Sequence, residues 1–169
     1  SNSIPIIPWR RASACVSSRS TKPETSRSSS SRQKKDFAIR YGIGAPFWQA
    51  AGPEASEEVL AYLEQNLQDL ANHYHALYQS AERPEDRPAH FAESARWYRE
   101  YLASFPDADG TPAIHYRFAD LLLENESFRD AADEYEEIAY GYPPHGQSDA
   151  AGYAAVFSRR EQLKAAPES

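Results

Sequence analysis

Residues 91–106 read FAESARWYREYLASFP, and residues 128–143 read FRDAADEYEEIAYGYP. The two stretches are copies offset by 37 residues. The identical pairs are Phe91/Phe128, Ala95/Ala132, Tyr98/Tyr135, Glu100/Glu137 and Pro106/Pro143. Each copy has helical spacing and closes on a proline, which cannot continue a helix. A repeat of this length built from helix–turn–helix units is typical of a solenoid.

Apolar residues at three- and four-residue steps predict helices outside the two copies as well. We expect a long helix over about 54–79, a helix from 91 to 105, a third beginning at Thr111-Pro112, a fourth over 128–142 and a fifth beginning at Ser148. No stretch of five or more residues alternates with period two between strand-type bounds. The sequence therefore predicts an all-α fold.

The chain divides into three parts by composition and charge. Residues 1–35 hold eleven Ser, eight Lys/Arg and one acid, a charge of +7, and we expect a basic, Ser-rich tail that is disordered or extended. Residues 36–52 include Phe37, Ile39, Phe47 and Trp48, which predict a structured lead-in to the first helix. Residues 53–165 are the predicted helical repeats, and residues 36–169 together carry a charge of −14.

The repeated positions resemble the tetratricopeptide repeat (TPR) family over roughly residues 60–160. One copy fills the family's positions with Phe118, Ala119, Leu122, Phe128, Ala131, Tyr135 and Pro143, and an earlier copy with Leu67, Leu70, Ala71, Tyr74, Phe91, Ser94, Tyr98 and Pro106. The resemblance implies a solenoid of about two and a half helical hairpins. Two departures are His115 at the opening large position and an insertion of about eleven residues around Pro84–Pro88.

Two phrases of the repeat, Tyr-x-Glu-x-x-x-x-Phe-Pro and Phe-x-x-Ala-x-x-x-Tyr, look most like bacterial cell-envelope members of the family. These include the outer-membrane assembly lipoprotein and the periplasmic coordinator of the Tol–Pal system. By this resemblance we expect the bacterial periplasm or cell envelope, and the cytoplasm is the alternative. No apolar run approaches the roughly 18 residues of a membrane span, so we expect none.

The sequence shows no pattern typical of a catalytic or metal site. His73 and His75 point about 200° apart on a helix, so they cannot share one ion. The other histidines lack His-Glu-x-x-His spacing, and the single Cys15 excludes a site built on several cysteines. We therefore expect no catalytic residues, no metal and no cofactor, and a protein that is not an enzyme.

The resemblance places a concave groove along the first helix of each hairpin. The positions that would face it are Gln68, Asn72, His75 and Gln79 on one helix and Tyr116, Asp120, Leu123 and Glu124 on the other. The family's carboxylate clamp, which grips chaperone C-termini, requires Lys where Gln68 stands and Asn where Asp120 stands. We therefore reject that clamp and expect a different partner.

The main functional hypothesis is a non-catalytic scaffold that binds a peptide or segment of another protein in this groove. The alternative is a purely structural fragment of a longer TPR array that self-associates through its C-terminal end. Tyr153, Val156 and Phe157 lie off the Ala-rich face of the last helix and favour that alternative. The basic tail could contact nucleic acid non-specifically, but no repeated basic–aromatic pattern predicts specific binding.

Overall fold

The structure is a computed structural model that describes residues 25–42, 45–46 and 53–165. Within these residues all regular structure is helical, which confirms the all-α prediction for this part of the chain. The helices are α1 (Thr25–Tyr41), α3 (Pro53–Gln79), the 3-10 turn η1 (Pro84–Asp86), α4 (Arg87–Ser104), α5 (Thr111–Glu124), α6 (Phe128–Tyr140) and α7 (Ser148–Ala165).

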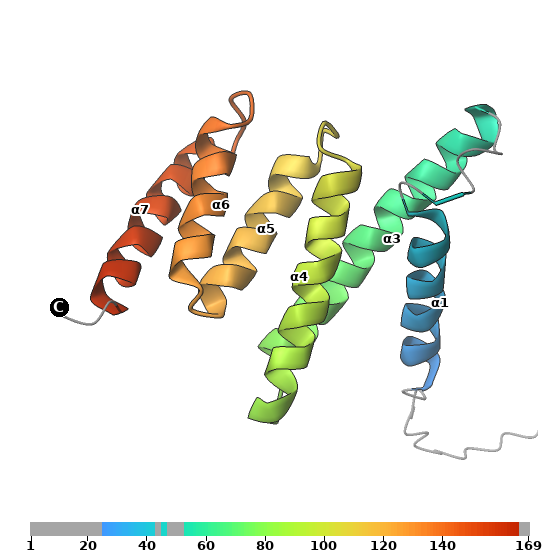
Figure 1. Cartoon of the computed structure of the whole chain (residues 1–169), viewed down its shortest axis with the longest axis horizontal. Coiled ribbons are helices and arrows are strands. Elements are labelled where there is room, and N and C mark those ends of the chain that lie inside the picture. Colours follow the sequence, from blue (N-terminus) through green and yellow to red (C-terminus); the bar gives the residue numbers. More distant parts are fainter. Residues whose placement is uncertain (1–24, 43–44, 47–52, 166–169) are drawn as a thin grey trace, which may run out of the picture.

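The helices stand side by side in one row, from α1 at one end to α7 at the other (Figure 1). Packing follows the chain: α1 contacts α3, α3 contacts α4, α5 contacts α4 and α6, and α6 contacts α7. Neighbours along the sequence are thus neighbours in space, which makes the contacts local. The helix predicted from residue 91 begins earlier, at Arg87, because Pro88 is tolerated in the first turn of a helix.

Small residues let the paired helices approach each other. Ala71 on α3 and Ala119 on α5 are both fully buried, and they occupy equivalent positions of the repeat. On the partner helix α4, the buried Ser94 hydroxyl donates to the Ala71 carbonyl at 3.0 Å. A large side chain at either alanine would separate the helices, since protein interiors are close-packed.

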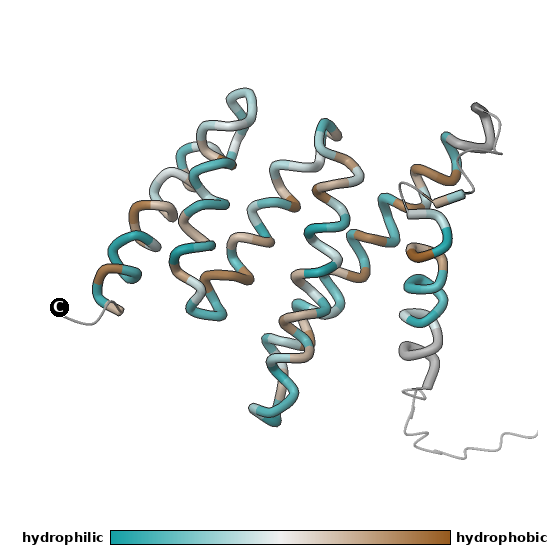
Figure 2. Tube along the Cα trace, in the orientation of Figure 1, coloured by the Kyte–Doolittle hydropathy of each residue, from teal (hydrophilic) through white to brown (hydrophobic). Residues whose placement is uncertain are grey.

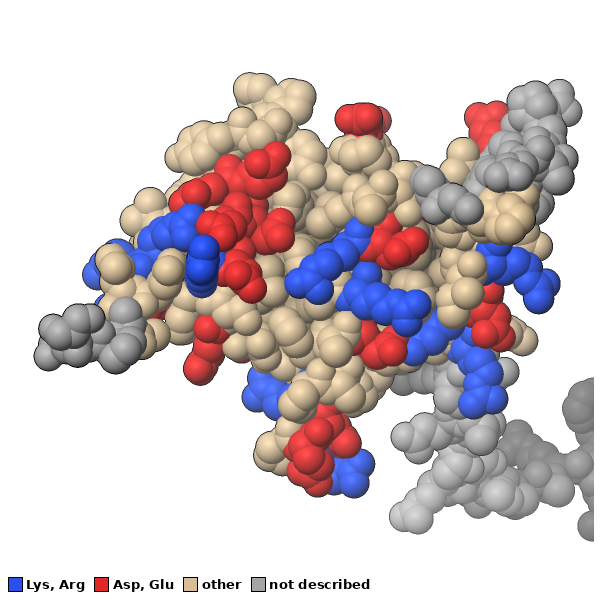
Figure 3. Space-filling view, in the orientation of Figure 1, with Lys and Arg blue, Asp and Glu red and all other residues tan. Residues whose placement is uncertain are grey.

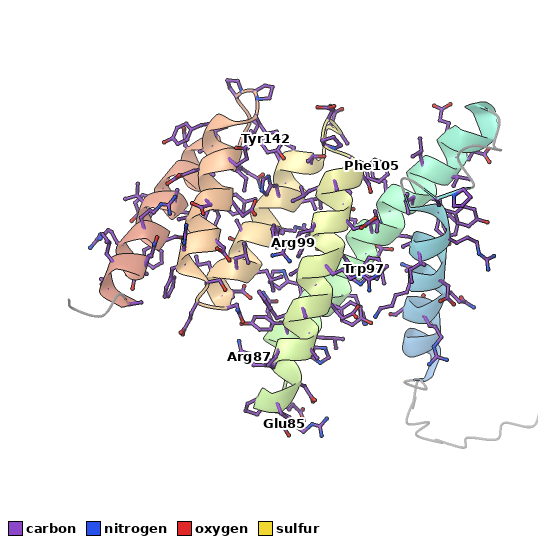
Figure 4. The ribbon with its side chains drawn as sticks, in the orientation of Figure 1. Glu85, Arg87, Trp97, Arg99, Phe105 and Tyr142 are labelled. Atoms are coloured by element: carbon purple, nitrogen blue, oxygen red, sulfur yellow. The ribbon has the colours of Figure 1, made fainter. Side chains whose placement is uncertain are left out.

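Helices α4 and α6 end shortly before equivalent aromatic residues: α4 ends at Ser104, one residue before Phe105, and α6 ends at Tyr140, two residues before Tyr142. Phe105 lies at the upper end of α4 and Tyr142 at the upper end of α6 (Figure 4), and Pro106 and Pro143 follow them. The first turn of α5 is tied to the end of α4, because the Thr111 hydroxyl donates to the Phe105 carbonyl at 2.5 Å. Thr111 therefore begins α5 as predicted, and its hydroxyl joins the start of α5 to the end of α4.

The turn between α5 and α6 places Glu126 in the left-handed region, with φ 59°. The Ser127 amide donates to the Leu122 carbonyl and the Glu126 amide to the Leu123 carbonyl, both at 2.9 Å. These two bonds form a Schellman C-cap, in which this position is usually Gly. A side chain with a Cβ atom is strained in this conformation.

Helix α1 differs from the tail expected over residues 1–35, because it covers residues 25–35 as well as the start of the lead-in. Its composition is hydrophilic, as the teal part of the tube in Figure 2 shows, and among its side chains described from Ser30 onward only Ala38 belongs to the buried core. Lys34 forms an ion pair with Asp69 of α3, and Lys35 Nζ lies 2.6 Å from Glu93 Oε2 of α4. The expected lead-in aromatics Phe47 and Trp48, and residues 1–24 of the tail, lie outside the described residues.

The buried alanine of α5 provides a test of the packing. Ala119→Leu adds three heavy atoms to a fully buried position, and overpacking of this kind should lower the free energy of unfolding by about 1–3 kcal/mol. Ala113→Leu, the same change at an exposed position of α5, should alter it by less than about 0.5 kcal/mol. Urea unfolding compares the two variants, and equal midpoints would show that the register assigned to α5 is wrong.

The strained turn provides a second test. Glu126→Gly should raise the free energy of unfolding by about 1 kcal/mol, because glycine adopts the left-handed conformation without the Cβ clash. Glu126→Ala is the control, since it removes the carboxylate but keeps the Cβ atom and should give no such gain. Thermal unfolding measures both, and a destabilised glycine variant would contradict the observed turn.

Candidate functional site

A strip of polar side chains joins α3 to α5. Arg117 Nη1 donates to Asn72 Oδ1 at 3.0 Å, and Gln79 Nε2 donates to Glu124 Oε1 at 2.8 Å. His75 Nε2 lies 3.2 Å from the other carboxylate oxygen of Glu124. The polar strip consists of these residues and Asp120: Asn72, His75, Gln79, Arg117, Asp120 and Glu124.

Two buried tyrosines, one on α4 and one on α6, form hydrogen bonds with residues of the polar strip. The Tyr98 hydroxyl, on α4, donates to Asn72 Oδ1 at 3.2 Å and lies 3.1 Å from His75 Nδ1. The Tyr135 hydroxyl, on α6, donates to Asp120 Oδ1 at 2.5 Å. Tyr98 and Tyr135 are equivalent residues of the 37-residue repeat. Asn72 and Asp120 are equivalent too once the insertion is counted. The same tyrosine hydrogen bond therefore occurs in both helical hairpins, α3–α4 and α5–α6.

Burial changes the acidity of the groups in the strip. Loss of solvent raises the pKa of Asp120, and the nearby negative charge of Glu124 raises it further. The Tyr135 hydrogen bond and the positive field of Arg117 lower that pKa, but by less. Burial likewise raises the pKa of Tyr98 and of Tyr135 far above that of a free phenol. Both hydroxyls therefore stay protonated and act as donors to the strip.

A cleft of about 360 Å³ adjoins the strip at Glu124. It lies where the end of α3, η1, the start of α4 and the turn after α5 meet, and it is lined by Tyr78, Pro84, Arg87, Pro88, Phe91, Glu124, Asn125 and Glu126. The Arg87 guanidinium sits 4.5 Å from the centre of the Tyr78 ring, at the lower end of α4 (Figure 4). The Tyr78 hydroxyl donates to the Glu124 carbonyl at 3.0 Å. The cleft thus has aromatic walls and a carboxylate rim, and its aromatic face already holds a cation.

The structure brings five of the eight predicted groove residues into the polar strip. His75 is one of these but is only 8% exposed, so most of its ring packs inside the protein. Tyr116 is half-buried with its ring 5.3 Å from that of Tyr135, and Leu123 packs against the core. Gln68 is half-buried on the same helix face.

The sequence reasoning missed Arg117 and the cleft. Arg117 precedes Asp120 by three residues and Glu124 by seven, so helical spacing alone places it on their face. The cleft had no such signal. It forms from the insertion itself, the residues that flank it and the turn after α5. Phe91 was assigned only to packing, and Tyr78 was given no role.

Comparison with known proteins gives no relative: no protein-family model, no curated protein and no solved structure matches the chain. Within the described part of the chain, no three His, Cys, Asp or Glu side chains are grouped so that they could hold a metal ion. No helix among residues 25–42 and 53–165 is long and apolar enough to cross a membrane.

The pKa of Asp120 predicts a pH dependence that Asp120→Asn should remove. Because the pKa is raised in the folded protein, Asp120 contributes full stability below its unfolded pKa and loses it as pH rises through the folded pKa. The Asn variant still accepts the Tyr135 hydrogen bond but does not ionise. Its stability relative to the parent should rise between about pH 3 and pH 7 in urea unfolding. A difference that stays constant over this range would contradict the raised pKa.

Proposed function

We propose that this protein is a non-catalytic scaffold that binds a basic segment of another protein along the polar strip and in the adjoining cleft. The observation that carries the proposal is the continuity of the two through Glu124, which belongs to both. One surface thus offers hydrogen-bonding groups for a backbone and an aromatic, acidic recess for a side chain. The proposal includes no catalytic step, no metal and no cofactor.

We infer further that the chain is a TPR-like solenoid of about two and a half hairpins. The support is the repetition of detailed contacts: equivalent alanines are buried on α3 and α5, and equivalent tyrosines donate to equivalent residues of those helices. In such an array the first helices would line one concave face. By the same resemblance, we propose a place in the bacterial periplasm or cell envelope.

The charge of the surface favours a basic partner. The polar strip holds two carboxylates and one guanidinium, and the cleft adds the Glu126 carboxylate and the Arg87 guanidinium, so carboxylates outnumber guanidinium groups by three to two. Elsewhere, acidic side chains gather over α6 (Figure 3), where Asp130, Asp133 and Glu137 are exposed. A Lys or Arg side chain could replace Arg87 over the Tyr78 ring, since cations bind aromatic faces. Long-range attraction by the acidic body would speed its approach.

Glu124→Gln tests this function. An array of short peptides that differ in Lys/Arg content identifies a ligand, and fluorescence anisotropy of that labelled peptide measures its dissociation constant. We expect binding to basic peptides, and roughly tenfold weaker binding by Glu124→Gln, because a charge-assisted contact is lost.

The matched control is Glu137→Gln, the same change at an exposed position of α6 outside the strip and the cleft. It lowers the negative charge by the same amount and should keep the parent affinity. Equal losses in the two variants would show that only the overall charge attracts the peptide. Absence of peptide binding by the parent protein would refute the proposed function.

The alternative, a structural fragment of a longer array, rests on a different part of the molecule. Its support is the apolar face that α7 leaves exposed, with Tyr153 79% and Leu163 75% accessible. In an array such a face would pack against the next helical unit.

A further inference from the structure

Helix α7 has two faces of opposite environment. On one face Ala151, Ala155 and Ser158 are buried, and α6 packs against this helix. The opposite face exposes Tyr153, Val156, Phe157 and Leu163. Figure 2 shows brown, hydrophobic segments along α7. With 3.6 residues per turn, these four side chains form one stripe along the helix. An exposed apolar stripe of this kind marks an interaction surface.

The internal repeat indicates that the stripe lies at a position that a neighbouring helix covers elsewhere in the chain. Residues of α7 follow those of α5 by 37 positions, so Val156 is the equivalent of Ala119. Helix α5 is packed between α4 and α6, and Ala119 is completely buried. Val156 is 61% exposed, although its position in the repeat is one that a following helix covers. The stripe therefore has the position and composition of a helix-packing surface.

We propose that a second copy of this chain covers the stripe, with the two α7 helices antiparallel about a two-fold axis between Val156 and Phe157. In this register Val156 of each copy lies opposite Phe157 of the other, and Tyr153 lies opposite Arg160. Both positions of each pair are exposed and lie at equal distances from the axis. Tyrosine and arginine are a favourable cation–π pair.

The charges at the two ends of α7 fit the same register. Asp149 is the acidic residue of the first turn, and Lys164 is the basic residue of the last turn. The midpoint between them is again the point between Val156 and Phe157, so each Asp149 meets the Lys164 of the other copy. In a parallel pair, Asp149 of one molecule would lie beside Asp149 of the other and Lys164 beside Lys164, so the charges would repel at both ends.

This self-complementarity selects a second copy over an unrelated partner. A two-fold contact uses the same patch on both molecules and closes after one pairing, so it produces a dimer and no filament. The proposed dimer surface is formed by α7 alone and is separate from the polar strip and the cleft. The dimer therefore does not depend on the peptide-binding function, and either proposal can fail without the other.

Charge exchange at the helix ends tests the register. Sedimentation equilibrium of the full chain over a hundredfold range of concentration should show a monomer–dimer equilibrium. Asp149→Lys and Lys164→Asp should each weaken the dimer at least about tenfold, since two attractive pairs become repulsive in each dimer. An equimolar mixture of the two variants should recover the parent affinity, because each lysine then meets an aspartate.

Two further variants separate the interface from effects on folding. Val156→Asp places a charge at the centre of the stripe and should abolish the dimer while the melting temperature of the monomer stays near that of the parent, because the position is exposed. Asp130→Lys makes the same charge reversal in the first turn of α6 and should leave the dimer intact. The proposal is overturned if the parent is monomeric throughout, if Val156→Asp dimerises like the parent, or if the mixture stays as weak as the single variants.

Discussion

The hydrogen bond from a buried tyrosine on the second helix of each hairpin to the first helix sets the arrangement of this protein. Tyr98 and Tyr135 are almost completely buried, and a buried hydroxyl without a partner costs about 1–3 kcal/mol. Each ring must fill the space between helices, and each hydroxyl must reach an acceptor. Asn72 and Asp120 supply those acceptors from equivalent turns of α3 and α5. The alanines one residue before them allow the close approach that this bond requires.

This constraint also explains why polar residues line one face of α3 and α5. Because the tyrosine hydroxyls point toward that face, the face must carry hydrogen-bond acceptors. One of these acceptors, Asn72, also accepts a hydrogen bond from Arg117 and so positions it. His75 bridges Tyr98 to Glu124 and so connects the first hairpin to the second. Asn72, His75 and Asp120 of the polar strip are therefore positioned by the buried tyrosines. Binding to such a surface costs less conformational entropy than binding to a mobile one.

Much of this could be predicted from the sequence, because the decisive contacts are local. Helical spacing and the 37-residue offset located the tyrosines, the buried alanines and the first residues of α5 and α6. The same spacing placed Asn72, His75 and Gln79 on one face. The partners across helices could not be predicted, since the Arg117–Asn72 bond depends on how far each helix is rotated. Helix α1 was missed for a related reason: its serine-rich sequence has no apolar periodicity, and its ion pairs are to residues more than 30 positions away.

The two ends of the row meet solvent in different ways. At one end α1 covers α3 with a hydrophilic helix, and its lysines neutralise carboxylates of α3 and α4. At the other end α7 turns an apolar stripe outward, although Arg159 of the same helix is bound to Asp133 and Glu136 of α6. A helix that served only as a solvent cap would need its polar side chains on the outer face. Helix α7 uses Arg159 in contacts with α6 and presents aromatic and aliphatic residues beside Arg160 on its outer face, which is a mixed distribution expected of a helix that packs against a second partner.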